Sequence, residues 1–161
     1  MLNKQDVIES IQLCLKERLA VSNKAALQAY EQATNEESVA ENKYDTFGLE
    51  ASYLAHGQSK RVIECENDLA VFVKRKSQYQ VVRPVVAEGC LVKLIDQSNQ
   101  MQYFFISPVA GGTKVTLKRE TITLISITSP LGKCLLGKEE GDDVVLNSAQ
   151  AMKTYEIEDC M

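Results

Sequence analysis

The sequence has no tryptophan, a single histidine (His56) and no long apolar run. One histidine leaves little for acid–base catalysis, and there is no glycine-rich phosphate loop, nucleophile elbow or HExxH helix. These absences argue against a self-contained enzyme. No segment approaches the roughly 18 consecutive apolar residues that a membrane helix needs, and the first residues lack the apolar stretch of a signal peptide. We therefore expect a cytoplasmic protein that makes no use of a membrane.

The five cysteines form no CxxC pair. Four-ligand zinc sites use such close spacings because one loop must deliver two thiolates to one ion. We therefore expect no cofactor of the protein's own and five free thiols in a reducing compartment, three or more of them as core filler. The cysteines are Cys14, Cys65, Cys90, Cys134 and Cys160.

The net charge of −4 argues against a protein that grips nucleic acid by its phosphates, since that requires a basic face. Any role near DNA or RNA would run through a protein partner. The charge pattern therefore favours a protein-binding function over direct nucleic-acid recognition.

Two long helical patterns fill the first half of the chain, separated by a polar, acidic segment at residues 34–45. Residues 6–33 contain no glycine or proline, and apolar or small residues recur three and four apart. That stripe is Ile8, Ile11, Leu15, Leu19, Ser22, Ala26, Ala29 and Ala33. Residues 46–76 repeat the spacing with Leu49, Tyr53, His56, Lys60, Ile63, Asn67, Ala70 and Val73, and Leu54, Val62 and Leu69 flank this stripe. We expect an antiparallel hairpin that buries the two stripes on each other and has an acidic tip.

After Lys76 the pattern changes to short β-branched segments punctuated by Gly, Pro, Asn or Asp. Residues 129–137 predict one short helix, with Ser129 as N-cap, proline in the first turn and glycine beyond the last. The fold class is therefore α+β, with a helical domain at residues 1–76 and a β domain at 77–161. Strands are expected at 85–95, 100–107, 113–117, 121–128, 142–147 and 153–158.

The segment from Ile125 to Val145 reads ISITSPLGKCLLGKEEGDDVV and resembles the C-terminal signature of the Gre transcription elongation factors. In that family a strand leads into an S-P-hydrophobic-G/A helix, followed by an L-x-G-K-x-x-G-D-x-V turn and strand. Tyr155-Glu156-Ile157 matches the family's last strand. The resemblance covers nearly the whole chain and implies an antiparallel coiled coil followed by a small FKBP-like β domain with one short helix.

The same resemblance implies a partner, bacterial RNA polymerase, and a mechanism. In the family the β domain docks at the mouth of a channel, and the coiled coil passes inward toward a backtracked RNA 3′ end. Carboxylates at its tip help hold a Mg²⁺ ion of the polymerase active site, because that ion prefers oxygen ligands. The chain would then be a monomeric accessory that meets RNA only within the polymerase complex.

The tip departs from the family pattern of Asp-x-x-Glu-Asn. Glu41-Asn42 matches the Glu-Asn pair, but Ser38 stands three positions before Glu41, and the nearest upstream acid is Glu37. Alignment from the second helix instead pairs Glu41 with Asp45. The catalytic candidates are therefore Glu41, Glu37 and Asp45, with Glu41 and Glu37 as the shared metal ligands. The alternative is a merely solvated acidic turn.

Pro130, Lys133 and Lys138 are the candidates for docking on the polymerase, because the family's β domain contacts it nearby. Three functions stay open. The first is a factor that stimulates transcript cleavage, and the second is a cleavage-inactive regulator that occupies the channel and competes with Gre factors or inhibits transcription. The altered tip spacing favours the second. The third is a prolyl isomerase or chaperone, which the scarcity of aromatic residues disfavours.

Overall fold

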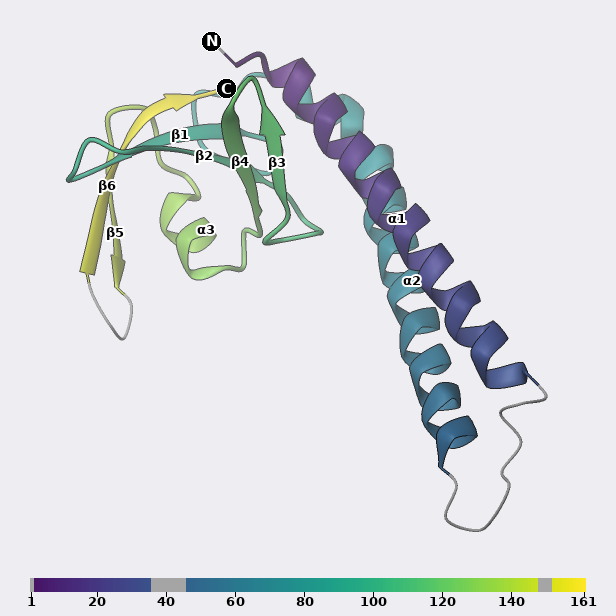
Figure 1. Cartoon of the computed structure of the whole chain (residues 1–161). Helices are drawn as coiled ribbons and strands as arrows, with labels where there is room; N and C mark the ends of the chain where they lie inside the picture. The colour runs from purple at the N-terminus through teal and green to yellow at the C-terminus, as the bar shows by residue number, and fades with distance from the viewer. Residues whose placement is uncertain (1, 36–45, 148–151) are drawn as a thin grey trace. The chain divides into compact units, whose positions relative to one another are not determined.

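The computed structural model describes residues 2–35, 46–147 and 152–161. Two long helices are followed by a six-stranded sheet and one short helix, so the predicted α+β fold class is confirmed (Figure 1). Two compact units are present: Leu13–Ala70, and Met1–Gln12 together with Val71–Met161. We call them the hairpin unit and the sheet unit. The division at residues 76 and 77 into separately folding domains stays a prediction, and the second helix runs through that position.

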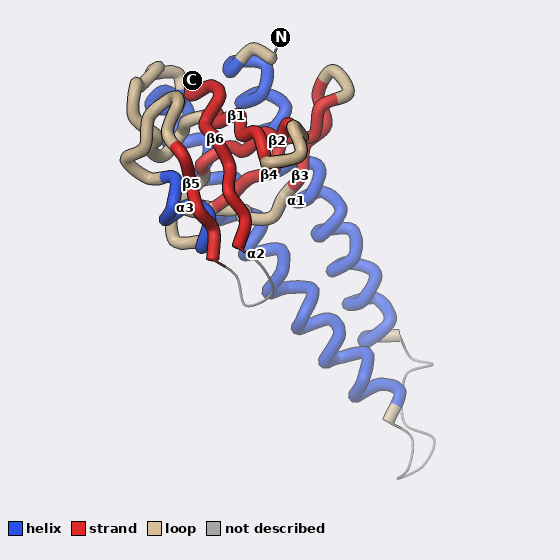
Figure 2. The backbone as a smooth tube through the Cα atoms, turned by 90° about the vertical axis from the view of Figure 1, so that its left-hand side faces the viewer, coloured by secondary structure: helices blue, strands red, loops and turns tan. Residues whose placement is uncertain are grey.

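The hairpin unit consists of most of α1 (Lys4–Thr34) and α2 (Phe47–Tyr79). Two contacts fix their relative direction: Ser22 Oγ lies 3.4 Å from Cys65 Sγ, and Arg18 lies 4.0 Å from Asp68. Residue numbers that rise along α1 thus fall along α2, which confirms the antiparallel hairpin. Figure 2 shows the two helices side by side.

The predicted stripe of α1 is confirmed, since it is buried or half-buried along its whole length. The predicted stripe of α2 is wrong, because Leu49, Tyr53 and Ile63 are 56%, 69% and 64% exposed. His56 and Lys60 on that face are exposed as well. The side chains that α2 buries or half-buries are Ala51, Ala55, Gln58, Val62, Cys65, Asp68, Leu69, Val71, Phe72, Arg75, Lys76 and Tyr79.

Both faces of α2 repeat at three and four residues, so periodicity cannot tell which one is buried. Apart from Leu15, the buried residues that the structure describes in the hairpin unit are small, Ala51 and Cys65 on α2 and Ser22 and Ala29 on α1, and Cys65 lies directly against Ser22. Short side chains let two helices approach toward the lower end of the usual interaxial range of about 8–10 Å. The face of α2 with small residues is therefore the buried one, while Leu49, Tyr53 and Ile63 face solvent.

The sheet has the strand order β3-β4-β2-β1-β6-β5. β2 and β4 run parallel, and the other neighbouring pairs are antiparallel. All six predicted strands are present. They are β1 (Leu91–Asp96), β2 (Met101–Ile106), β3 (Lys114–Leu117), β4 (Glu120–Ile125), β5 (Asp143–Asn147) and β6 (Met152–Cys160).

The first strand begins later than predicted, at Leu91 rather than near residue 85. Only Val85 makes an isolated bridge, to Glu139. Gly89 ends the preceding turn with φ +86°, a backbone conformation that suits glycine. A Cβ at Gly89 would also lie 2.4 Å from Cδ1 of Tyr79, so glycine lets the end of α2 lie against this turn.

The two faces of the sheet bury different partners. Phe105 packs with Phe72 and Tyr79 of α2, with ring centroids 5.2–6.0 Å apart. Its neighbour Phe104 points to the opposite face, because side chains alternate along a strand. That face forms the main core together with α3 (Pro130–Leu135). The core residues are Val86, Cys90, Val92, Leu94, Phe104, Ile106, Leu135, Val144, Tyr155 and Ile157.

Within the described residues, neither long helix is apolar enough to cross a membrane.

Candidate functional site

The predicted catalytic residues Glu37, Glu41 and Asp45 lie outside the described residues, so their roles stay predictions. The structure does describe where α2 begins after them. Glu50 N donates to Thr46 O at 2.9 Å, and the Thr46 hydroxyl donates to the Glu50 carboxylate at 2.9 Å. The negative charge of Glu50 in the first turn also stabilises the helix, because it lies near the positive end of the helix dipole. α2 therefore has a defined start next to the predicted acidic tip.

The predicted docking residues lie on or just after α3, and its capping is as predicted. Ser129 has extended backbone angles (φ −67°, ψ 157°), and its hydroxyl accepts from Gly132 N at 3.0 Å. The same hydroxyl donates to Ser126 O at 2.6 Å. Pro130 stands in the first turn, where a missing N–H costs nothing. The Ser-Pro pair of the sequence signature thus sets where this helix begins.

Gly132 occupies the G/A position of the signature, and the packing of this chain requires glycine there. A Cβ there would lie 2.0 Å from Ser126 O, so a larger residue would push α3 away from the strand end before it. Three residues on, Leu135 is fully buried in the core. After the helix, Gly137 N donates to Val86 O at 3.0 Å, and Val86 N donates to the carbonyl of Lys138 at 2.8 Å. Hydrogen bonds and close packing therefore hold α3 at both ends.

The G-K-x-x-G-D part of the signature builds the turn between α3 and β5. Gly137 and Gly141 have φ of +79° and +86°, which glycine adopts without strain. The Asp142 carboxylate accepts from Glu139 N at 2.9 Å, and Gly141 N donates to Ile157 O at 2.8 Å. These residues position the turn, and the basic side chains beside it are left to contact a partner.

Of the three predicted docking residues, Pro130 and Lys133 are exposed and Lys138 is half-buried. Pro130 and Lys133 are three apart on one helix, so they lie on the same side of α3. Leu136, directly after the helix, is 50% exposed. It has left the helical conformation (φ −58°, ψ 127°), which turns its side chain outward. The exposed surface at α3 therefore combines Pro130, Lys133 and Leu136, with the half-buried Lys138 two residues further along the chain.

Among the described residues, no three His, Cys, Asp or Glu side chains lie close enough together to bind a metal ion. The carboxylates Glu41 and Glu37 have the oxygen chemistry that Mg²⁺ prefers, and they belong to the segment outside the described residues. Their role as ligands therefore stays a prediction from the sequence.

Comparison with known proteins gives one family. The family profile described as "Transcription elongation factor, GreA/GreB, C-term" matches residues 81–161, which contain α3 and every strand of the sheet. A GreA of Nitratidesulfovibrio vulgaris is 28% identical over 153 residues, which are 88% of this chain and 82% of that protein. A GreA of Sulfurovum sp. is 37% identical over 76 residues, which are 47% of this chain and 44% of that protein.

A third curated relative, the GreA of Rhodospirillum rubrum, is 24% identical over 152 residues, covering 94% of this chain and 91% of that protein. Among solved structures, GreA factor homolog 1 (Gfh1) of Thermus thermophilus is 19% identical with a TM-score of 0.38. That comparison covers 98% of this chain and 94% of the other. The similarity to named relatives thus extends beyond the sheet unit into the two helices.

Proposed function

This chain belongs to the GreA/GreB family of transcription elongation factors, and from that premise we propose that it binds RNA polymerase and promotes cleavage of backtracked RNA. The observation that carries the proposal is the signature segment, whose residues build α3 and its turn by the contacts described above. These contacts fix the backbone conformation of α3 and its turn, and none of them builds a catalytic site. A segment that matches the family signature and carries exposed basic side chains is suited to bind a protein partner.

The docking surface is the exposed side of α3 with the turn after it. This surface exposes two apolar residues, Pro130 and Leu136, and one basic residue, Lys133. Lys138 lies at its edge. α3 is fixed before any partner arrives, so little conformational freedom is lost on binding. Lysine side chains on the surface would pair with an acidic patch of the polymerase and speed association.

The cleavage step is assigned to the acidic tip. Glu41, with Glu37 or Asp45, would supply carboxylate oxygens in the polymerase active site. The Mg²⁺ of that site supplies stabilisation of the attacking and leaving oxygens of the RNA phosphate. The hairpin supports the role, since its closely packed seam gives a slender rod and α1 alone is about 46 Å long by its rise per residue. The protein would act within the polymerase complex in the cytoplasm, and not as an enzyme alone.

The direct test is transcript cleavage in purified, backtracked RNA polymerase complexes with Mg²⁺. We expect the wild-type chain to shorten the RNA and Glu41→Ala to slow cleavage at least about tenfold, as loss of a group that tunes a metal site does. Glu37→Ala and Asp45→Ala identify the second acid. Glu66→Ala, an exposed acid elsewhere on α2, is the matched control and should cleave like wild type. Equal cleavage by wild type and Glu41→Ala would remove the tip from the mechanism.

A second function, a regulator that binds without cleaving, is favoured by one sequence feature. Ser38 stands where the family pattern has its first acid. A serine hydroxyl is a weaker Mg²⁺ ligand than a carboxylate, because it carries no charge. This function predicts no cleavage by the wild-type chain and progressive loss of another Gre factor's cleavage as the chain is added. Absence of polymerase binding would exclude both functions.

A further inference from the structure

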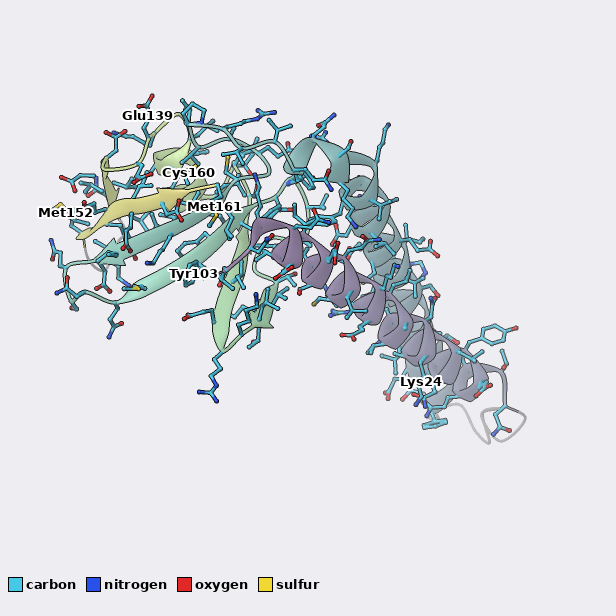
Figure 3. The ribbon with its side chains drawn as sticks, turned by 90° about the horizontal axis from the view of Figure 1, so that it is seen from above. Lys24, Tyr103, Glu139, Met152, Cys160 and Met161 are labelled. Atoms are coloured by element: carbon cyan, nitrogen blue, oxygen red, sulfur yellow. The ribbon has the colours of Figure 1, made fainter. Side chains whose placement is uncertain are left out.

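Two of the five cysteines come together in the sheet unit. Cys160 ends β6, and its Cα is paired with that of Val92 in β1. Leu91 and Met161 exchange backbone hydrogen bonds of 2.8 and 2.9 Å, which fixes this register (Figure 3 labels Cys160 and Met161). Cys90 stands two residues before Val92 and so points to the same face of the sheet. The two thiols are therefore diagonal neighbours across two adjacent strands.

A buried lysine lies beside the two thiols. Lys4, at the start of α1, is only 8% exposed, and its ammonium donates to Val81 O at 3.0 Å. Burial lowers the pKa of Lys4, and the negative charge of the two cysteines opposes that shift. A charged lysine is rarely buried without a partner. One carbonyl accounts for one of its three donors, so a thiolate nearby is a natural second partner.

Further groups around the pair favour a thiolate on Cys90. The backbone N–H of Ala87 donates to Cys90 Sγ at 3.4 Å. Two backbone carbonyls lie at longer range, Val85 O at 3.8 Å from Cys90 Sγ and Arg83 O at 3.9 Å from Cys160 Sγ, so the single proton of Cys160 is free to turn toward Cys90. The pKa of Cys90 is lowered to about 6, chiefly by a hydrogen bond from Cys160. The Ala87 N–H and the positive charges of Lys4 and Arg83 act in the same direction, and together these interactions outweigh the effect of burial. The same hydrogen bond raises the pKa of Cys160. The surroundings of the pair therefore favour the thiolate on Cys90 over the thiolate on Cys160.

The other three cysteines have different surroundings. Cys65 is buried against the Ser22 hydroxyl at 3.4 Å, and burial raises the pKa of Cys14. Cys134 is half-buried on α3 and packs against the core. A low thiol pKa beside a second thiol is the arrangement that supports reversible oxidation. Cys90 and Cys160 combine those features.

We propose that Cys90 and Cys160 form a peroxide-sensitive thiol pair, with Lys4 as the residue that positions and stabilises the Cys90 thiolate. The Cys90 sulfur attacks one oxygen of hydrogen peroxide, the O–O bond breaks, and the hydroxide that leaves becomes water by taking a proton from solvent. Cys160 then attacks the resulting sulfenic acid on Cys90, forms the S–S bond and gives its proton to the departing hydroxide. Two thiols are oxidised and one peroxide is reduced to two waters.

The geometry also selects the oxidant. Cys90 is 1% exposed while Cys160 is half-buried, so the pair is open to solvent only on the Cys160 side. Hydrogen peroxide is close to water in size, and a bulky oxidised thiol such as glutathione disulfide is not. We therefore expect peroxide to oxidise the pair faster than glutathione disulfide does. This inference stands independently of the proposed action on RNA polymerase, because it concerns contacts within the sheet unit.

The test is peroxide treatment of the full chain, followed by alkylation, digestion and mass spectrometry. We expect a peptide linked between Cys90 and Cys160, two hydrogens lighter than the reduced pair, while Cys134 stays open to alkylation. Cys160→Ser should stop the reaction at a sulfenic acid on Cys90 that dimedone traps. Cys134→Ser is the matched control and should oxidise like wild type. Oxidation of Cys134 as fast as Cys90, or a missing linked peptide, would overturn the proposal.

The role of Lys4 needs its own measurement, the pH dependence of Cys90 alkylation. Lys4→Met removes the charge and keeps the chain length, so the midpoint should rise by about one pH unit and the rate below it should fall about tenfold. Lys4→Arg should restore much of the rate, and Lys24→Met, on an exposed part of α1, should change nothing. The remaining charged or titratable neighbours, Arg83, Cys160 and Asp159, are unchanged in these variants. An unchanged midpoint of Cys90 alkylation in Lys4→Met would show that Lys4 does not stabilise the Cys90 thiolate.

Discussion

The hairpin unit and the sheet unit bury different kinds of side chain. The sheet unit encloses large residues completely, among them Phe72, Tyr79 and Phe105. In the hairpin unit the buried positions include Ser22 and Ala51, and many large apolar residues face solvent. Apolar burial stabilises a fold by about 25 cal/mol per Å², so the sheet unit gains more stabilisation from buried apolar surface than the hairpin unit. We therefore expect hydrogen exchange to be slower in the sheet unit than in the hairpin unit.

Glycine-to-alanine substitution should change the free energy of unfolding in opposite directions in the two units. This pair of variants should therefore show the difference between the units most clearly. In the sheet unit, Gly132→Ala places a Cβ 2.0 Å from Ser126 O and should lower the free energy of unfolding by about 3 kcal/mol. In the hairpin unit, Gly57 of α2 has open space around its Cα, and Gly57→Ala should raise it by about 0.5–1 kcal/mol. Denaturant unfolding of both variants measures this. A destabilised Gly57→Ala would contradict the described packing of α2.

Truncation of apolar side chains separates the units in the same way. Leu135→Ala in the sheet unit should cost about 2–5 kcal/mol, because the side chain is fully buried. Ile63→Ala in the hairpin unit should change stability by less than about 0.5 kcal/mol, since the side chain is 64% exposed. Thermal and denaturant unfolding report both values. A costly Ile63→Ala would restore the stripe that periodicity predicted for α2.

A larger side chain at the contact between α1 and α2 tests whether small residues are needed in the hairpin unit. Cys65 is buried against Ser22, so Cys65→Leu should force the helices apart and cost about 1–3 kcal/mol. Leu54→Met, an exposed substitution of similar volume on α2, is the control and should be neutral. Hydrogen exchange should show the loss of protection within residues 13–35 and 46–70. A neutral Cys65→Leu would mean that close approach does not hold this hairpin.

The last prediction concerns pH, and its effect should be confined to the sheet unit. The pKa of Cys90 in the folded chain is about 6, below the ordinary thiol value of about 8.5 in the unfolded chain. Its contribution to stability is therefore present above the unfolded pKa and is lost as pH falls toward 6. Denaturant unfolding of wild type and Cys90→Ser should give stabilities that converge as pH is lowered over this range. A constant difference would show that Cys90 carries no charge there.

Local chemistry made much of the sheet unit predictable. Asp96 accepts from the N–H groups of Ser98 and Gln100 at 2.8 and 2.9 Å, the bonding to nearby backbone that makes aspartate a common turn residue. The Ser129 cap was likewise readable from residue type alone. The buried face of α2 was not, because Ile63 and Val62 fit equally periodic stripes and only the partner helix decides between them. Helix faces are therefore less predictable than turns and caps.

The candidate sites show the same limit. The signature around α3 was visible in the sequence, and Pro130 and Lys133 are exposed as a docking role requires. The thiol pair was not visible, because Cys90 and Cys160 are far apart in the sequence. Only the pairing of β1 with β6, including a register shift between Lys93 and Leu94, brings them together. A contact set by long-range strand register leaves no spacing for a sequence pattern to detect.

The most direct test of the central claim is the affinity of the full chain for purified bacterial RNA polymerase core enzyme. Wild type should bind, and Lys133→Glu should weaken binding at least about tenfold, which is about 1.4 kcal/mol. Lys114→Glu, an equal charge change on the exposed strand β3, should bind like wild type. Equal affinities for all three chains would show that α3 is not the docking surface. No binding by wild type would contradict action on the polymerase.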